Sequence, residues 1–405
     1  MKYPWDYLIV ASRIPAELEG TLRDVGVDDA KAALEDLGLE PWLKELIRAL
    51  LFELDGDLGS ALSILEGINE KNFYVLYNEL RLYTVVGNFE NAELCEGALK
   101  KIELDKRQSG LVENERGKRM WKKSAYKEAI NSYTEMLQTA LELGDRFLES
   151  IGYNNIAIVM LDMGDYQQAK DLFRKSLEID IALKNERDVA TTELNLGECC
   201  RMMGDLETAK EFFNECLDSC AVLDSYNNSR LSADCYWNLG QIYMQERDFE
   251  KARDCLEKAF ELGVRTGDDQ LLVRIHLAMG SLEVACGSPD EAREHMRSAY
   301  ERAKAIGSKR HEAESYALRG RIFEKERKYS EALQSYGLAA FLFRQISDKY
   351  DMAKMEEAAG SIYLVQGNTE RAVEYFKKAK AKYAALSYAD FVAIDEKLKE
   401  AEGLE

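Results

Sequence analysis

Proline is almost absent from this chain: only four of its 405 residues are proline. Three of them fall within residues 1–42, and none lies between Trp42 and Ser288. Because proline removes a backbone donor and interrupts helices, that stretch carries no helix breaker of this kind. The composition therefore predicts an all-α protein.

Positive charge is also in short supply, with 54 Lys and Arg residues against 74 Asp and Glu residues and a net charge of −20. Such a charge repels nucleic-acid phosphates and anionic membranes, so we expect neither as a partner. A solvated acidic surface is the simpler explanation, and a dedicated site for basic ligands is the alternative. The chain lacks a signal-peptide pattern and any apolar run long enough to span a bilayer, which predicts a cytoplasmic protein.

Signatures of catalysis are missing as well. The sequence has no glycine-rich phosphate loop, no nucleophile elbow and no zinc-protease helix motif. Its three histidines, His276, His295 and His311, are more than four residues apart. His276 stands 40 residues after Tyr236 and 40 before Tyr316, so we expect a packed core side chain. We expect no enzyme activity and no cofactor.

None of the eight cysteines forms a C-x2-C pair. We therefore expect small buried hydrophobic residues rather than metal ligands, and no metal. The alternative is a metal site formed where five of them converge: Cys199, Cys200, Cys216, Cys220 and Cys235.

Two small residues recur at a fixed spacing along the chain. Alanines follow one another in steps of 31, 37, 40, 40, 43, 40, 40 and 40 residues, at Ala61, Ala92, Ala129, Ala169, Ala209, Ala252, Ala292, Ala332 and Ala372. Twelve residues before each lies a second small residue, with Leu80 the exception: Ala49, Gly117, Ala157, Gly197, Gly240, Gly280, Gly320 and Gly360. This period predicts repeated helix pairs, with small residues where two backbones approach closely.

One copy reads Tyr236-Trp237-Asn238-Leu239-Gly240-Gln241-Ile242-Tyr243 and is followed by Ala252. It resembles the tetratricopeptide repeat, whose pattern places an aromatic, Leu-Gly and Tyr on a first helix and Ala on a second. The period near 40 resembles the longer-helix subgroup of kinesin light chains, LGN-type polarity adaptors and bacterial peptide-sensing regulators. Asn154-Asn155-Ile156-Ala157 in particular resembles the Asn-Asn-Leu-Ala of kinesin light chain repeats. The resemblance is strong over residues 109–386 and weak over 43–108.

The resemblance implies an all-α, right-handed α-solenoid superhelix of about nine helix pairs, with first helices lining a concave face. We expect an N-terminal helical cap at 1–42, two degenerate pairs at 43–108, seven units at 109–386 and a C-terminal capping helix at 387–405. The alternative for residues 1–42 is a small effector module.

In such solenoids function is recognition on the concave face. We expect a scaffold or adaptor that binds a peptide segment of a partner protein in this groove. The alternative is a ligand-responsive regulator that changes superhelical shape on peptide binding, and the oligomeric state is left open. Co-chaperone repeats clamp a C-terminal carboxylate with lysine and arginine, but the matching positions here lack them, so we expect no such clamp: Asn154, Ile158, Asn195, Asp234 and Asn238.

A repeated asparagine suggests where the partner lies. Asn155, Asn195 and Asn238 each stand two residues before the small position, although asparagine is unfavourable inside helices. Each amide either bridges to the adjacent helix and sets the superhelical pitch, or pairs with a peptide backbone. Alternating charges flank this face: Arg274, Arg321 and Lys354 alternate with Asp234, Glu314 and Glu357. We predict a peptide-binding groove lined by Asn114, Lys118, Trp121, Asn154, Asn155, Asn195, Glu198, Arg201, Trp237, Asn238, Gln241 and Arg274.

Helix starts and two unusual glutamates give further expectations. We expect a capping side chain before the second helix at Asp57, Asn88, Asp165, Asp205, Asp248, Ser288 and Asn368. Ala125 and Lys328 break this pattern. Glu193 and Glu283 stand where other units have aromatics, and because a buried unpaired carboxylate is costly, we expect each to be solvated or paired.

Overall fold

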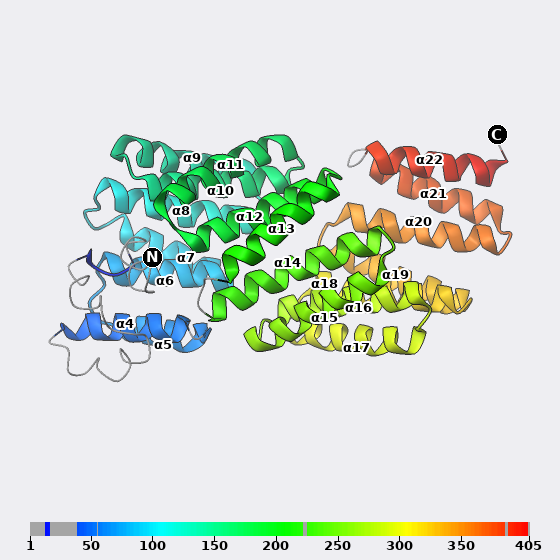
Figure 1. The fold of residues 1–405 in the computed structure, drawn as a ribbon, viewed down its shortest axis with the longest axis horizontal. Coiled ribbons are helices and arrows are strands. Elements are labelled where there is room, and N and C mark those ends of the chain that lie inside the picture. Colours follow the sequence, from blue (N-terminus) through cyan, green and yellow to red (C-terminus); the bar gives the residue numbers. More distant parts are fainter. Residues whose placement is uncertain (1–12, 17–38, 55, 222–224, 385–387, 404–405) are drawn as a thin grey trace. The chain divides into compact units, whose positions relative to one another are not determined.

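The computed structural model describes residues 13–16, 39–54, 56–221, 225–384 and 388–403. Within these ranges the regular structure is helical, and the helices follow one another in antiparallel pairs (Figure 1). Most of the cap predicted at 1–42 lies outside the described residues. No helix in the described part of the chain combines the length and apolar character needed to cross a membrane.

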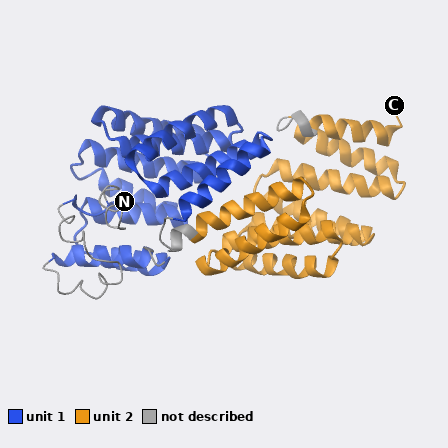
Figure 2. Ribbon diagram, in the orientation of Figure 1, with its two compact units in different colours: residues 1–222 blue, residues 223–405 orange. Residues whose placement is uncertain are grey.

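The chain divides into two compact units, residues 1–222 and 223–405 (Figure 2). Unit 1 contains the helices α4 (Pro41–Leu54), α5 (Leu58–Gly67), α6 (Phe73–Val86), α7 (Phe89–Leu99), α8 (Lys106–Lys122), α9 (Tyr126–Leu143), α10 (Arg146–Asp162), α11 (Tyr166–Leu183), α12 (Glu186–Met202) and α13 (Leu206–Cys220).

Unit 2 contains the helices α14 (Ser225–Gln245), α15 (Phe249–Thr266), α16 (Asp269–Cys286), α17 (Pro289–Ala305), α18 (Lys309–Lys325), α19 (Tyr329–Gln345), α20 (Lys349–Val365), α21 (Thr369–Tyr383) and α22 (Tyr388–Glu402). The boundary between the units was not predicted. It falls within the single 43-residue step of the alanine series, between Ala209 and Ala252.

Among helices α8–α13 and among helices α14–α22, each first helix packs against the second helix of its own pair, and that second helix packs against the first helix of the next pair in the same unit, as α10 does with α11 and α11 with α12. Neighbouring first helices also touch, as α16 does with α18. The predicted all-α solenoid of helix pairs is therefore confirmed within each unit.

In several pairs the glycine is required by a side chain of the second helix. A Cβ added at Gly197 would lie 2.5 Å from the Cε1 atom of Phe213, and one added at Gly320 would lie 2.5 Å from Cε1 of Tyr336. Both rings stand four residues after the repeat alanine. An aromatic ring therefore fills the space over these two glycines. At Gly240 an added Cβ would lie 2.8 Å from Leu256 and 3.5 Å from the carbonyl oxygen of Ala252, so the expected close approach of two backbones is present there.

Six of the seven predicted caps accept a hydrogen bond from the first turn of the second helix: Asp57, Asn88, Asp165, Asp205, Asp248 and Asn368. The prediction was wrong for Ser288, whose side chain makes no capping bond, although Pro289 occupies the first helical position. Ala125 and Lys328 also provide no side-chain cap, as expected.

The predicted C-terminal helix is present as α22. Ile394 and Leu398 are buried against α21, where they pack with Phe376 and Tyr383. The opposite face is charged, and Asp395 forms ion pairs with lysines of α21 and of its own helix. Helix α22 therefore covers the last helix pair of unit 2.

Candidate peptide-binding face

Asparagine side chains join three successive first helices of unit 1. The Nδ2 atom of Asn155 donates to Oδ1 of Asn114 at 2.7 Å, which connects α10 to α8. In the next pair Nδ2 of Asn195 donates to Oδ1 of Asn154 at 3.0 Å, which connects α12 to α10. We call these four residues the amide ladder. The predicted bridge to the adjacent helix is thus present in unit 1.

The amide ladder also keeps unused polar atoms at the surface. Asn155 and Asn195 are partly exposed, and their Oδ1 atoms accept no hydrogen bond from the described residues. Asn114 is only 3% exposed, so its amide serves as a buried acceptor. The prediction of Asn114 as a ligand contact therefore needs correction, because its neighbour covers it.

Asn238 does not continue the amide ladder. It is fully buried, and its Nδ2 atom donates to the carbonyl of Asp234 in its own helix, α14. In both bridges the acceptor is the residue three positions before the small residue of the preceding unit. In the unit that precedes Asn238, this position is occupied by Leu194. A leucine offers no acceptor, and this signal was overlooked. Asn238 is corrected from a ligand contact to a core residue.

The other predicted groove residues of unit 1 also lie on first helices. Trp121 on α8 donates its Nε1 proton to Oδ2 of Asp162 on α10 at 2.5 Å. Lys118 forms an ion pair of 2.7 Å with the buried Glu115. On α12, Glu198 and Arg201 are partly exposed. The Trp121 ring therefore packs against the hydrophobic cluster of Ala129, Tyr133, Ile156 and Val159, and its Nε1 proton is already donated to Asp162.

In unit 2 the structure brings Trp237 and Arg274 together. The guanidinium carbon of Arg274 lies 4.0 Å from the centre of the Trp237 ring, a cation–π contact. Trp237 donates from Nε1 to the carbonyl of Arg274 at 3.3 Å, and Arg274 forms an ion pair of 2.9 Å with Asp234. Gln241 follows on α14, partly exposed. These contacts join α14 to α16.

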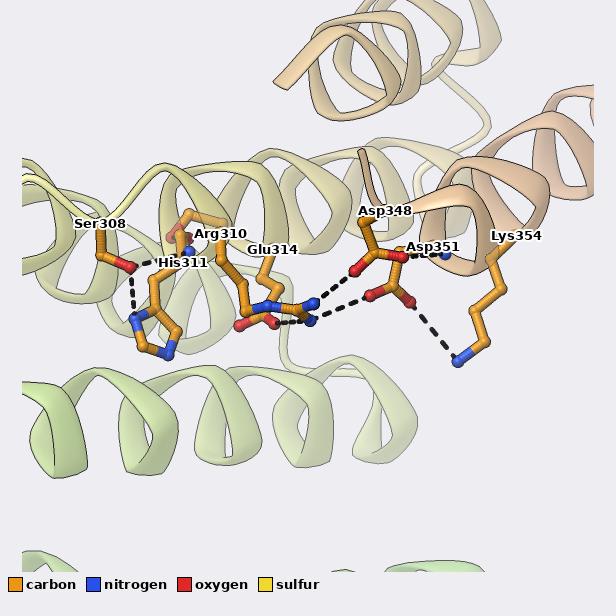
Figure 3. A network of polar contacts seen from close by, with 8 residues as sticks. Ser308, Arg310, His311, Glu314, Asp348, Asp351 and Lys354 are labelled. Atoms are coloured by element: carbon orange, nitrogen blue, oxygen red, sulfur yellow. Dashed lines mark hydrogen bonds and ion pairs between the residues drawn. The ribbon is translucent and has the colours of Figure 1, made fainter. Parts of the chain in front are cut away.

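A further set of charged residues joins α18 to α20, and of these Arg310, Asp348 and Asp351 were not predicted from the sequence (Figure 3). Arg310 forms an ion pair with Asp348, and it lies 3.3 Å from Asp351 and 3.7 Å from Glu314. Lys354 lies 3.7 Å from the same Asp351. We call the residues that join the first helices of unit 2 the charge ladder: Asp234, Arg274, Arg310, Glu314, Asp348, Asp351 and Lys354.

A signal for part of this network was available in the sequence. Asp234, Arg274, Glu314 and Lys354 are spaced 40 residues apart, so their side chains share one register and alternate in sign. Burial raises the pKa of Glu314 to about 7, while Arg310 acts against the shift and Asp351 adds to it. The pKa of Asp234 is raised by burial too, with Arg274 opposing the shift.

A second polar cluster lies inside unit 1. Asp180 of α11 is 1% exposed and accepts a hydrogen bond of 2.6 Å from Ser150 of α10 and a longer one, 3.3 Å, from Ser176. Burial raises the pKa of Asp180 to about 7, and the nearby Asp188 of α12 adds to the shift. This carboxyl group is therefore held among hydroxyl groups with no cation bound to it.

The histidines lie in packed surroundings. His276 is 7% exposed, its ring lies against Phe260, and its Nδ1 atom is 3.2 Å from Nδ1 of His295. Burial lowers the pKa of His276 to about 4. This agrees with the packed core position expected for it.

No group of histidine, cysteine and carboxylate residues in the described part of the chain has the arrangement of a metal site. Seven cysteines are buried and one, Cys286, is exposed. The alternative of a metal site among converging cysteines is therefore not supported by the described residues.

The two unusual glutamates behave differently. Glu283 forms the expected ion pair, with Arg253. Glu193 is 8% exposed, and its Oε2 atom is buried without a hydrogen-bond partner. Burial raises its pKa, which a hydrogen bond with Ser219 only partly offsets. The expectation of solvation or pairing was wrong for this second oxygen of Glu193.

Comparison with known proteins gives a direct test of the repeat assignment. The tetratricopeptide repeat family matches residues 148–221, 188–263 and 357–381. These matches include the copy around Gly240 and Ala252 from which the repeat was recognised. No curated protein matches the sequence.

Solved structures similar to this one cover almost the whole chain. The apo form of the quorum sensor NprR from B. thuringiensis is 17% identical, with 88% of this chain and 99% of that chain covered and a TM-score of 0.63. A Rap protein complexed with competence and sporulation factor is 15% identical, with 93% and 99% covered and a TM-score of 0.62.

The Rap conjugation gene regulator of the plasmid pLS20, in complex with the Phr* peptide, is 17% identical, with 90% and 96% covered and a TM-score of 0.57. At such identities the likeness concerns the fold alone. Tetratricopeptide repeats are therefore detected over residues 148–263 and 357–381, and the fold of the chain is similar to that of these proteins.

Proposed function

We propose that this protein is an interaction scaffold that binds an extended peptide segment along its first helices. The observation that carries the proposal is the amide ladder, where Asn155 and Asn195 are partly exposed and each keeps an Oδ1 atom that has no partner among the described residues. A carbonyl oxygen at each step can accept from a peptide N–H group regardless of the peptide sequence. The structures similar in fold include a quorum sensor and a complex with the Phr* peptide, which supports the same class of function.

Other properties belong to this proposal. We infer that the protein acts without a catalytic step, cofactor or metal, that it binds neither nucleic acid nor membranes, and that it works in the cytoplasm. The excess of acidic residues supports the choice of partner, because it repels polyanions.

The proposal is tested by the double variant Asn155→Ala and Asn195→Ala. The peptide is identified first. The protein is purified from its native cells, and the peptide bound to it is eluted and identified by mass spectrometry. Calorimetry with the synthetic peptide is expected to show binding weakened by about 1 to 3 kcal/mol for each lost amide contact.

The matched control is Asn114→Ala, which breaks the bond to Asn155 but leaves the exposed amide of Asn155 in place. Normal binding by this control, with helicity retained in both variants, supports direct contact with the peptide. Equal loss of binding in the control and the double variant would mean that the amide ladder only positions the helices.

The second candidate is a regulator whose shape changes when the peptide binds. It is favoured by the presence of a quorum sensor among the proteins similar in fold. Small-angle scattering with and without the identified peptide separates the two functions. A changed radius of gyration is expected for the regulator, and an unchanged radius for a passive scaffold.

A further inference from the structure

Helix α18 carries two opposite charges on one face. Glu314 and Arg321 are seven residues apart, which is close to two helical turns, so their side chains share a face about 10 Å apart along the axis. Both are oriented toward α16. Arg321 donates from Nη2 to Oγ of Ser281 on α16 at 2.9 Å, and Glu314 is close enough to Arg274 of α16 for its pKa to respond.

Arg321 has unused capacity to bind an anion. It makes no ion pair within the described residues and donates the one hydrogen bond to Ser281, although a guanidinium has five N–H donors. Its side chain is exposed to solvent, yet surrounding protein desolvates the group enough to lower its pKa. A carboxylate matches the planar fork of this group and forms two parallel hydrogen bonds with it.

Arg319, two residues earlier, is different because it is already engaged. Its Nε atom donates to Ser335 at 3.0 Å, and its guanidinium lies 4.7 Å from the ring centre of Tyr316. Arg319 therefore packs toward α19, and it provides a control on the same helix.

Around Glu314 negative charge is in excess, in contrast to the positive charge of Arg321. Three carboxylates, those of Glu314, Asp348 and Asp351, share the cations Arg310 and Lys354, so that one negative charge is in excess when Glu314 is ionised (Figure 3). Burial of Glu314 makes that excess costly. A cationic group placed beside Glu314 would neutralise it.

We propose that α18 holds a peptide at two points, with a carboxylate of the peptide on Arg321 and an ammonium or guanidinium group on Glu314. The proposal rests on the peptide-binding function proposed above and specifies its ligand. An extended chain advances about 3.3 to 3.6 Å per residue, so the two charges of the peptide stand about three residues apart. This site differs from the co-chaperone clamp, which draws its cations from several helices.

The experiment uses a phage-displayed library of random-sequence peptides selected on the full-length protein and on three variants: Arg321→Gln, Glu314→Gln and the control Arg319→Gln. Peptides selected by the native protein and by the control are expected to carry a cationic and an acidic residue about three positions apart. Arg321→Gln is expected to lose the enrichment for the acidic residue, and Glu314→Gln the enrichment for the cationic one. Circular dichroism and melting temperature establish that each variant is folded.

A selected peptide is then synthesised with its acidic residue replaced by the corresponding amide. Calorimetry is expected to show binding at least tenfold weaker to the native protein and unchanged binding to Arg321→Gln. Selected peptides without this charge pattern, or equal effects in Arg321→Gln and Arg319→Gln, would overturn the two-point site while leaving peptide binding intact. If the native protein selects no peptides, the proposed function fails and the site fails with it.

Discussion

Near the middle of the first helices, neutral amides connect α8, α10 and α12 of unit 1, whereas charged side chains connect α14 to α16 of unit 2. Near the helix starts both units use ion pairs, Arg107 with Asp145 in unit 1 and Arg310 with Asp348 in unit 2. Asn155 and Asn195 each bond to an amide of the preceding first helix, while Arg274 and Arg310 form ion pairs with carboxylates of neighbouring ones. The two ladders occupy corresponding faces of the same repeat. Neighbouring first helices are therefore joined by side-chain contacts on this face in both units, but the residue types that make the contacts differ.

The two units also differ in where they hold a carboxyl group with a pKa near 7. In unit 1 Asp180 lies in the interior among serine hydroxyls, while in unit 2 Glu314 lies on the face of α18 beside Arg310. Protonation of Asp180 therefore acts on stability alone, while protonation of Glu314 also changes the charge offered to a ligand.

The largest expected effect comes from removing α22, because this deletion should destabilise unit 2 and leave the stability of unit 1 unchanged. Deleting residues 388–405 exposes the core that Ile394 and Leu398 cover and removes their burial, worth roughly 3 to 6 kcal/mol together. We expect a lower melting temperature, with faster hydrogen exchange in α21 and unchanged exchange in α10 and α11, because a repeat contacts only its neighbours. An unaltered melting temperature would show that α22 contributes nothing to unit 2.

The next effect concerns Asp180, whose pKa is raised in the folded protein from 3.8 to about 7. The folded state holds this proton more tightly than the unfolded state, so its contribution to stability falls as the pH rises through that window. The loss is on the order of 4 kcal/mol between about pH 4 and pH 8. Asp180→Asn is expected to remove this dependence, measured by urea unfolding at several pH values. Parallel pH profiles for the native protein and the variant would refute the buried-proton assignment.

A pair of single substitutions compares the ladders directly. Asn195→Ala removes a neutral hydrogen bond and is expected to cost about 1 kcal/mol at low and high salt alike. Arg274→Gln removes a partly exposed ion pair and is expected to cost about 0.5 to 1 kcal/mol at low salt and less in 1 M salt. Chemical unfolding at two salt concentrations measures both. The comparison fails if the two variants respond equally to salt.

The smallest effect concerns a turn. Arg327 has a φ of 62°, in the left-handed region, where the corresponding turn residues Gly287 and Gly367 are glycines. Arg327→Gly relieves this strain and is expected to stabilise unit 2 by about 0.5 kcal/mol, since greater freedom in the unfolded chain offsets part of the gain. Thermal unfolding measures the change, with Gly367→Ala as the opposite control, expected to destabilise.

Most of the fold could be predicted from the spacing of the repeats. The alanine period predicted the helix pairs of residues 109–386, because each copy repeats the same capping and packing pattern. The capping helix predicted at 387–405 lies beyond the last repeat alanine and is observed as α22, Tyr388–Glu402. The unit boundary could not be read in the same way, since it reflects how many contacts cross a segment rather than any residue type.

The candidate site was only partly predictable. Trp237 and Arg274 share a face, and their contact follows from a spacing of 37 residues in a 40-residue repeat. The partner of each asparagine was not evident, because Asn154 and Asn155 are adjacent and only the packed geometry decides which points forward. The role of Arg310 depends on Asp348 and Asp351, which lie at the start of the next first helix.

Because the signs of the charge ladder alternate, the array keeps opposite charges next to each other only when an even number of repeat units is lost or gained. Loss of the one unit that contains Arg274 would place Asp234 next to Glu314, two acids in the same register, whereas loss of two units would restore opposite neighbours. Asparagine is its own complement, because it both donates and accepts. Duplication or deletion of units is therefore free to occur singly along the amide ladder but is expected in pairs along the charge ladder.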